Sequence, residues 1–148
     1  ALGSFPSRSQ AAIAVRNTNL RELPTSEPRF SEPTPDPKAN PFDYFQYSLL
    51  PVGTPVLIAH MSRDGRWYYV ECPVAGGWVA VEDLAPVSAE FRHAYRSSAF
   101  AALVRDKVNI ATPTGSITAN IGALLPMRSG YAAPAGADSG MAASGFTK

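Results

Sequence analysis

Three short runs rich in β-branched and aromatic residues constrain the fold of this chain most strongly. They span 55–61, 66–72 and 77–81, and such runs favour β-strands. The pair Asp64-Gly65 lies between the first two runs and is typical of a tight hairpin turn, because both residues tolerate positive φ. The looser sequence PVAGG separates the last two runs. The three runs therefore predict an antiparallel meander of three strands.

The segment before the meander predicts one more strand and a long loop. The run 11–16 has the alternation of a strand. Six prolines fall within 24–41 and exclude a helix there, so we expect a Pro-rich loop over 20–50. Together these segments predict a small β-barrel over 11–86, preceded by an N-terminal extension over 1–10.

The segment after the meander predicts a helix and a second set of strands. Ser88 is a candidate N-cap for one short helix, which we place in a linker over 87–98. Beyond it, apolar runs flank a turn after Thr112 and favour antiparallel strands. The tail from Ser129 onward is rich in Gly, Ala and Ser, so we expect a second barrel over 99–148 that is truncated.

Composition excludes several classes of function. Among the 148 residues, 17% are charged and the formal net charge is +1, so nucleic acid is not the expected partner. No apolar run reaches the roughly 20 residues of a membrane span. One cysteine and two histidines exclude a zinc site of several Cys or His ligands and a disulfide within the chain. We expect no metal and no cofactor, and we interpret the chain as a processed product or a fragment.

The single cysteine and the two histidines have structural interpretations as well as catalytic ones. Cys72 shares one strand face with Tyr68 and Val70, which we assign to the core, so a buried thiol is favoured over a nucleophile. His60 ends a strand before the hairpin turn and would satisfy a turn hydrogen bond. His93 would lie on a solvated face of the helix. A free-standing cysteine enzyme using Cys72 stays open as an alternative.

Aromatic and acidic residues are the candidates for binding a ligand, because rings and phenol hydroxyls suit peptides and sugars. Phe42, Phe45 and Trp78 also belong to this aromatic set, but the core is an alternative place for them. The two carboxylates could accept a hydrogen bond from a peptide amine, although Asp64 could instead stabilise its own turn. The ligand-binding residues that we predict are Asp43, Tyr44, Tyr47, Asp64, Trp67 and Tyr69.

Several segments in sequence order resemble a known family. The stretches VGTPVLIAHMSRDGRWYYV (52–70) and GWVAVEDLA (77–85), with LRELPT (20–25) and FDYFQYSLL (42–50), resemble the bacterial SH3 domain that precedes the catalytic domain of NlpC-type cysteine peptidoglycan endopeptidases. The stretch RDKVNIATPTGSITANIGALLPM (105–127) is similar to the second SH3-like domain of that family. The resemblance implies an all-β chain of two small SH3-like barrels joined by a short helix.

The resemblance also implies a function. Members similar to γ-D-glutamyl-L-diamino acid endopeptidases place their first barrel against one side of the catalytic cleft, which favours peptides with a free N-terminal amine. The nucleophile in an Asp-Cys-Ser context has no match here. We therefore expect a non-catalytic module that recognises the peptidoglycan stem peptide and positions it for a cysteine peptidase domain encoded beyond Lys148, in cis or as a separate piece.

Two further expectations accompany this interpretation. The chain should work in the cell envelope, either periplasmic or extracellular, with a lipid anchor on a removed N-terminal segment as one option. The Pro-rich segment leaves an alternative function open, because its spacing is also found in proteins that interact through prolines. In that case the chain would be a protein-interaction module that binds a Pro-rich or other peptide partner.

Overall fold

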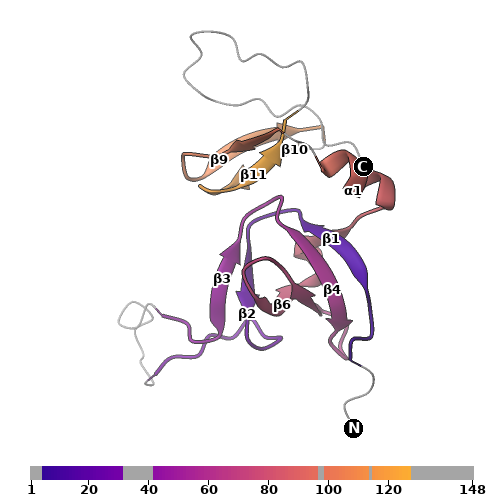
Figure 1. Cartoon of the computed structure of the whole chain (residues 1–148). Coiled ribbons are helices and arrows are strands. Elements are labelled where there is room, and N and C mark those ends of the chain that lie inside the picture. Colours follow the sequence, from indigo (N-terminus) through magenta and orange to yellow (C-terminus); the bar gives the residue numbers. More distant parts are fainter. Residues whose placement is uncertain (1–4, 32–41, 97–98, 114, 128–148) are drawn as a thin grey trace.

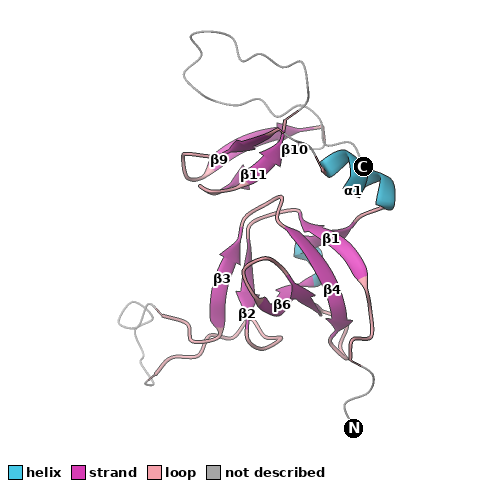
Figure 2. Ribbon diagram, in the orientation of Figure 1, coloured by secondary structure: helices cyan, strands magenta, loops and turns pink. Residues whose placement is uncertain are grey.

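The structure is a computed structural model that describes residues 5–31, 42–96, 99–113 and 115–127 (Figure 1). The predicted all-β class is confirmed, because strands dominate and a single short α-helix is present among the described residues (Figure 2). The elements are β1 (Gln10–Ala14), β2 (Thr18–Arg21), β3 (Gln46–Leu50), β4 (Pro55–Met61), β5 (Trp67–Glu71), β6 (Gly76–Ala80), a 3-10 turn (Val81–Asp83), β7 (Leu84–Pro86), α1 (Ala89–Tyr95), β8 (Phe100–Ala102), β9 (Val108–Thr112), β10 (Gly115–Ala119) and β11 (Leu124–Pro126).

The first section forms one sheet with the strand order β3-β2-β6-β5-β4-β1-β7. Strands β4, β5 and β6 pair antiparallel with their neighbours in sequence, so the predicted meander is confirmed. The strand order does not close on itself among the described residues. The SH3-like all-β fold that we predicted is present, with sheets that are not closed.

The turn between β4 and β5 differs from the predicted one in a single residue. Gly65 has a φ of 73°, and its amide donates to the Ser62 carbonyl at 3.0 Å. Asp64 does not adopt positive φ, since Lys107 is the only non-glycine residue that does so in the described ranges. Only Gly65 therefore supplies the left-handed conformation of this turn, and the prediction of positive φ at both Asp64 and Gly65 is wrong for Asp64.

Two strands lie within the region predicted as a loop. Residues 20–50 include the end of β2 and the whole of β3, which pair antiparallel. Leu20 and Leu50 are fully buried in the core, and this burial explains why the strands form in a polar sequence. Thr18 is buried as well, and its hydroxyl donates to Asp83 Oδ2 at 2.6 Å. Part of the Pro-rich loop, 32–41, lies outside the described residues.

The core of the first section lies on the inner face of the sheet. Val70 is fully buried, and Tyr68 and Cys72 pack against the same cluster, so the face assignment made for 66–72 is confirmed. Burying a Val, Leu or Ile side chain contributes about 1.5–3 kcal/mol each. The buried members are Ala12, Ala14, Leu20, Leu50, Val56, Ile58, Val70, Val79 and Leu84.

The second section has its own smaller core. The Ser88 hydroxyl accepts a hydrogen bond from the Phe91 amide at 3.0 Å, which confirms the predicted cap of α1. Strands β9 and β10 form the hairpin expected after Thr112, and β8 pairs with β11. The tail that we expected to leave this section truncated lies outside the described residues. The buried members of this core are Val52, Leu103, Ile110, Ala119, Ala123 and Leu125.

Contacts at the turn between β3 and β4 join the two sections, which lie end to end at this turn (Figure 1). Val52 comes from this turn but is buried in the second core. The Asn17 side-chain amide donates to the Thr118 carbonyl at 2.9 Å and accepts from the Val52 amide at 3.1 Å. The Tyr95 hydroxyl donates to the Gly53 carbonyl at 2.6 Å. Hydrogen bonds and apolar packing thus hold the sections together.

No helix in the described ranges is long and apolar enough to cross a membrane.

Candidate functional site

Three aromatic side chains line up across the outer face of the meander. Register places Tyr69 on β5 opposite His60 on β4 and opposite Trp78 on β6. The Tyr69 and Trp78 rings meet edge to face with centroids 5.5 Å apart, and His60 and Trp78 lie at 6.4 Å. Phe5 of the N-terminal segment covers the row, with centroids 5.7 Å from His60 and 5.6 Å from Tyr69. Such tilted ring pairs are favourable arrangements.

A β-bulge explains why His60 joins this row. The register between β4 and β5 shifts between Ile58 and His60, so Ala59 is an extra residue. Strict alternation would put His60 on the same face as the fully buried Ile58, and the extra residue turns it outward. The Ala59 carbonyl is then available to accept from the amides of Ser7 and Arg8, both at 3.0 Å.

The N-terminal segment is held against the sheet by side-chain contacts as well, one on the outer face and one with a ring of the inner face. Ser7 Oγ and His60 Nδ1 share a hydrogen bond of 2.6 Å. The Arg8 guanidinium lies over the Tyr68 ring at 5.8 Å from its centroid. The structural partner of His60 is therefore a serine far away in the sequence, and not the turn hydrogen bond expected for this histidine.

The aromatic row lines a pocket of about 490 Å³, which we call the His60 pocket. Gly76 makes room for one wall, because a Cβ atom there would lie 2.7 Å from the Tyr69 hydroxyl. The walls are mostly aromatic, as is usual for sites that bind small ligands. The residues that line it are Phe5, Pro24, His60, Ser62, Arg63, Tyr69 and Trp78.

A buried ion pair holds the described ends of the Pro-rich loop beside the pocket. Arg21 is 5% exposed, and its guanidinium donates to Asp43 Oδ2 and to the Glu27 carbonyl, each at 2.8 Å. Asp43 Oδ1 accepts from the amides of Arg29 at 2.9 Å and Phe45 at 3.0 Å. Desolvation raises the pKa of Asp43, but these hydrogen bonds outweigh it and leave the pKa below its usual value of 3.8. We call this arrangement the Arg21–Asp43 clamp.

Asp64 is occupied in a similar way within the hairpin turn. Its carboxylate accepts from the Ser62 hydroxyl at 2.6 Å and from the Arg66 guanidinium at 2.8 Å. These hydrogen bonds lower the pKa of Asp64 to about 2. The turn-building alternative for Asp64 therefore describes its contacts in the structure.

The predicted ligand-binding residues do not gather at one place. Tyr69 lines the His60 pocket, whereas Trp67 lies on the same strand outside the pocket lining. Tyr44 and Tyr47 are more than half exposed and do not line the pocket. Asp43 belongs to the clamp and Asp64 to the turn, as described above.

The core alternative fails for part of the aromatic set. Phe42 is 75% exposed, so the core interpretation of this residue is wrong. Phe45 is half-buried and lies under the Arg29 guanidinium. Trp78 is half-buried on the outer face instead of in the core. One feature of the sequence indicates part of the pocket. Once the runs 66–72 and 77–81 are paired as a hairpin, Tyr69 and Trp78 lie opposite each other.

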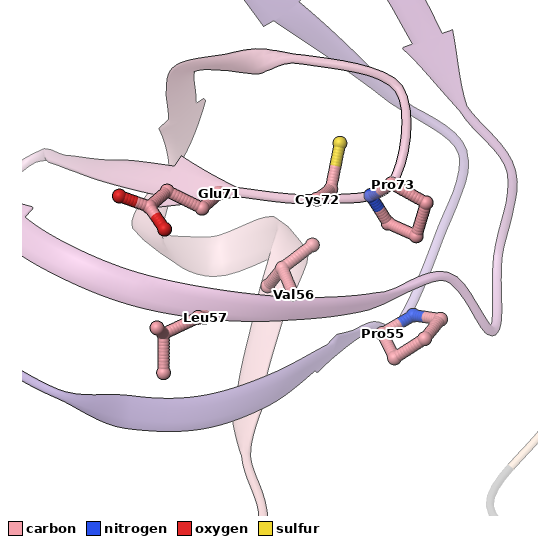
Figure 3. Close-up of a pocket in the computed structure, with 6 residues that line it drawn as sticks. All are labelled: Pro55, Val56, Leu57, Glu71, Cys72 and Pro73. Carbon is pink, nitrogen blue, oxygen red and sulfur yellow. The ribbon is translucent and has the colours of Figure 1, made fainter.

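Cys72 lies in a shallow hollow of about 300 Å³ at the other end of β5. Figure 3 shows Cys72 between Glu71 and Pro73 along the chain, with its sulfur pointing away from Val56 and Leu57 of β4. The thiol donates to the Ala75 carbonyl at 3.0 Å, and neither histidine lines the hollow. His93 is exposed on α1, as predicted. Within the described residues, no group of three or more His, Cys, Asp or Glu side chains could hold a metal ion.

Comparison with protein families and with solved structures finds similar proteins. Residues 28–80 match the family of SH3 domains of the SH3b1 type. The chain is also similar to a solved NlpC/P60 endopeptidase from Photobacterium damselae subsp. piscicida, with 28% sequence identity and a TM-score of 0.72. No curated protein matches the sequence.

These two matches confirm the resemblance drawn from the sequence. Residues 28–80, which match SH3 domains of the SH3b1 type, lie within the first section. The structural similarity covers 87% of this chain, which is more than the first section could supply, so it extends into the second section. The chain spans 30% of the length of the solved endopeptidase, and is thus similar to part of that protein.

Proposed function

We propose that this chain is a non-catalytic module that recognises the peptidoglycan stem peptide and positions it for an NlpC-type cysteine endopeptidase domain in the cell envelope. The observation that carries the proposal is the similarity to an NlpC/P60 endopeptidase over 87% of this chain but only 30% of the other. The catalytic domain would be a partner in cis or a separate piece. Cys72 is not assigned a catalytic role, because its thiol bonds to a backbone carbonyl and a thiolate needs an adjacent base.

The His60 pocket is the place where we propose that the peptide binds. Its walls carry Tyr69 and Trp78 from a three-stranded support, which holds them at fixed positions. Rigid aromatic side chains give large contact area at little cost in conformational entropy. Asp43 and Asp64 are not proposed as acceptors for a peptide amine, because each carboxylate already accepts three hydrogen bonds.

Calorimetric titration of the 148-residue chain with soluble stem peptides tests this proposal. We expect Tyr69→Ala to weaken binding by about tenfold, because it removes one ring of the pocket. Tyr47→Ala is the matched control, since this tyrosine is 56% exposed outside the pocket. Tyr69→Phe keeps the ring and guards against loss of folding. Equal affinities for all four proteins would contradict the His60 pocket as the binding site, and absence of binding would contradict the function.

One observation favours a second function, the binding of a Pro-containing peptide partner. The segment Phe5-Pro6-Ser7-Arg8 of the chain itself places Phe5 on the aromatic row, and the amides of Ser7 and Arg8 both donate to the Ala59 carbonyl. An external peptide with the same features could bind in the same manner. Titration with a Phe-Pro-Ser-Arg peptide separates the two functions, because only the second predicts that this peptide binds more tightly than a wall fragment.

A further inference from the structure

Several hydrogen-bond donors that line the His60 pocket have no partner among the described residues. Neither the Trp78 indole N–H nor the Tyr69 hydroxyl hydrogen-bonds to another described residue. Ser62 is different, because its hydroxyl donates to Asp64 and accepts from the Trp67 amide. An indole can only donate, whereas a hydroxyl can donate or accept. The unpartnered groups of the pocket therefore favour a ligand rich in acceptors.

Arg63 adds a positive charge to this set of donors. Its side chain is exposed at the pocket rim and makes no ion pair or hydrogen bond within the described ranges. The neighbouring Arg66 is instead paired with Asp64 at 2.8 Å. In this hairpin, the charge of Arg66 is balanced by Asp64, whereas the charge of Arg63, which lines the pocket, has no such partner.

Carboxylates near the pocket do not cancel this charge. Asp64 is neutralised by Arg66, and Asp43 is neutralised by Arg21 in the clamp. Glu71 lies on the same face of β5 as Tyr69, but it lines the hollow around Cys72. No acidic residue lines the His60 pocket among the described residues.

We propose that the His60 pocket selects ligands that carry a carboxylate, and that Arg63 is the residue that determines this specificity. A guanidinium matches the planar geometry of a carboxylate and can bind it through two parallel hydrogen bonds. The aromatic walls would hold the apolar part of the ligand. This inference rests on the proposed function and names its ligand class: a stem peptide whose glutamate keeps a free α-carboxylate.

Matched pairs of peptides test the inference. The first pair is L-alanyl-γ-D-glutamyl-L-alanine amide, in which the α-carboxyl of the glutamate is the one free carboxyl group, and the same peptide with an α-carboxamide. The second pair has no relation to the cell wall: acetyl-Ala-Glu-Ala-amide and acetyl-Ala-Gln-Ala-amide. Binding to the 148-residue chain is followed by the NMR shift of the Trp78 indole. The variant is Arg63→Gln, and Arg92→Gln on the exposed face of α1 is the control for net charge.

We expect each acid to bind about three- to fivefold more tightly than its amide, the upper part of the range for an ion pair formed near solvent. Arg63→Gln should abolish the difference and Arg92→Gln should preserve it. A higher salt concentration should reduce the difference in affinity between acid and amide, because exposed charges are screened.

The outcomes separate the inference from the proposed function. A preference for the acid that depends on Arg63 and is seen in both peptide pairs supports the inference and the proposed function. The same preference in the second pair alone supports the inference and overturns stem-peptide recognition. Equal affinity for the acid and the amide overturns the inference but does not contradict the proposed function. The same holds if the difference in affinity persists in Arg63→Gln. No binding of any peptide overturns both.

Discussion

The Arg21–Asp43 clamp allows a sharp test of whether Asp43 is structural or binds ligand. In Asp43→Asn, the amide oxygen can still accept from the Arg29 and Phe45 amides. The amide nitrogen, however, replaces the oxygen that lies 2.8 Å from the Arg21 guanidinium, so two donors face each other. Arg21 then keeps only its bond to Glu27, and its Nε already has no hydrogen-bond partner in the structure.

The size of the effect follows from burial. The side chains of Arg21 and Asp43 are 6% and 16% exposed, and removing one partner of a buried pair costs about 3–5 kcal/mol. We expect the lower end, about 3 kcal/mol, because the slightly exposed carboxylate position lets water approach the guanidinium. For a chain of this length, 1 kcal/mol shifts Tm by roughly 3 °C. The predicted loss is therefore about 9 °C.

Thermal and urea unfolding of the wild type and Asp43→Asn measure this loss directly. Glu90→Gln on the exposed side of α1 is the control, with an expected change within about 0.5 kcal/mol. The double variant Arg21→Met with Asp43→Asn should recover part of the loss, because it removes the unpaired buried charge. A Tm for Asp43→Asn within about 1 °C of the wild type would refute the clamp.

The pH dependence gives a second measure of the same pair. The pKa of Asp43 is lower in the folded chain than its ordinary value of 3.8. Its stabilising effect is therefore fully present above pH 3.8 and is lost as the pH falls through the folded pKa. The difference in stability between wild type and Asp43→Asn should accordingly shrink below about pH 3.8. A difference that stays constant across this range would contradict the ion pair.

Three further predictions concern other parts of the structure. The Asp64 carboxyl should titrate near pH 2 in an NMR titration, and a pKa near 3.8 would contradict its bonds to Ser62 and Arg66. Phe5→Ala should speed hydrogen exchange of the Ser7 and Arg8 amides, whereas unchanged exchange would mean that the ring does not hold the segment. Tyr95→Phe should cost about 1 kcal/mol in urea unfolding, because it removes the bond to the Gly53 carbonyl; an unchanged midpoint would contradict that contact.

Local sequence patterns were sufficient for much of the fold. Strands β4, β5 and β6 follow from β-branched runs bounded by turn residues, and α1 follows from Ser88. Strand β2 could not be predicted in this way, because two of its four residues are the buried polar side chains Thr18 and Arg21. Their burial depends on Asp83 and Asp43, partners that no local pattern reveals.

The candidate site was harder to predict for the same reason. Tyr69 was found because it lies on a strongly patterned strand. For His60, the sequence predicts only a strand end with a turn hydrogen bond. A bulge at Ala59 reverses the side to which His60 points, and a strict period of two cannot anticipate the extra residue. The contact with Ser7 spans 53 residues of sequence, so only the folded chain brings the two together.

The clamp and the His60 pocket are mechanically connected, and this connection gives Asp43 an indirect role in binding. Arg21 on β2 is the register partner of Trp78 on β6, which lines the pocket. The loop that the clamp holds carries Pro24, which also lines the pocket. Weakening the clamp should therefore loosen both of these lining residues although Asp43 touches no ligand. We expect Asp43→Asn to lower affinity for the acid and for the amide peptide by the same factor, whereas Arg63→Gln lowers it for the acid alone. A selective loss of acid binding in Asp43→Asn would contradict this division of roles.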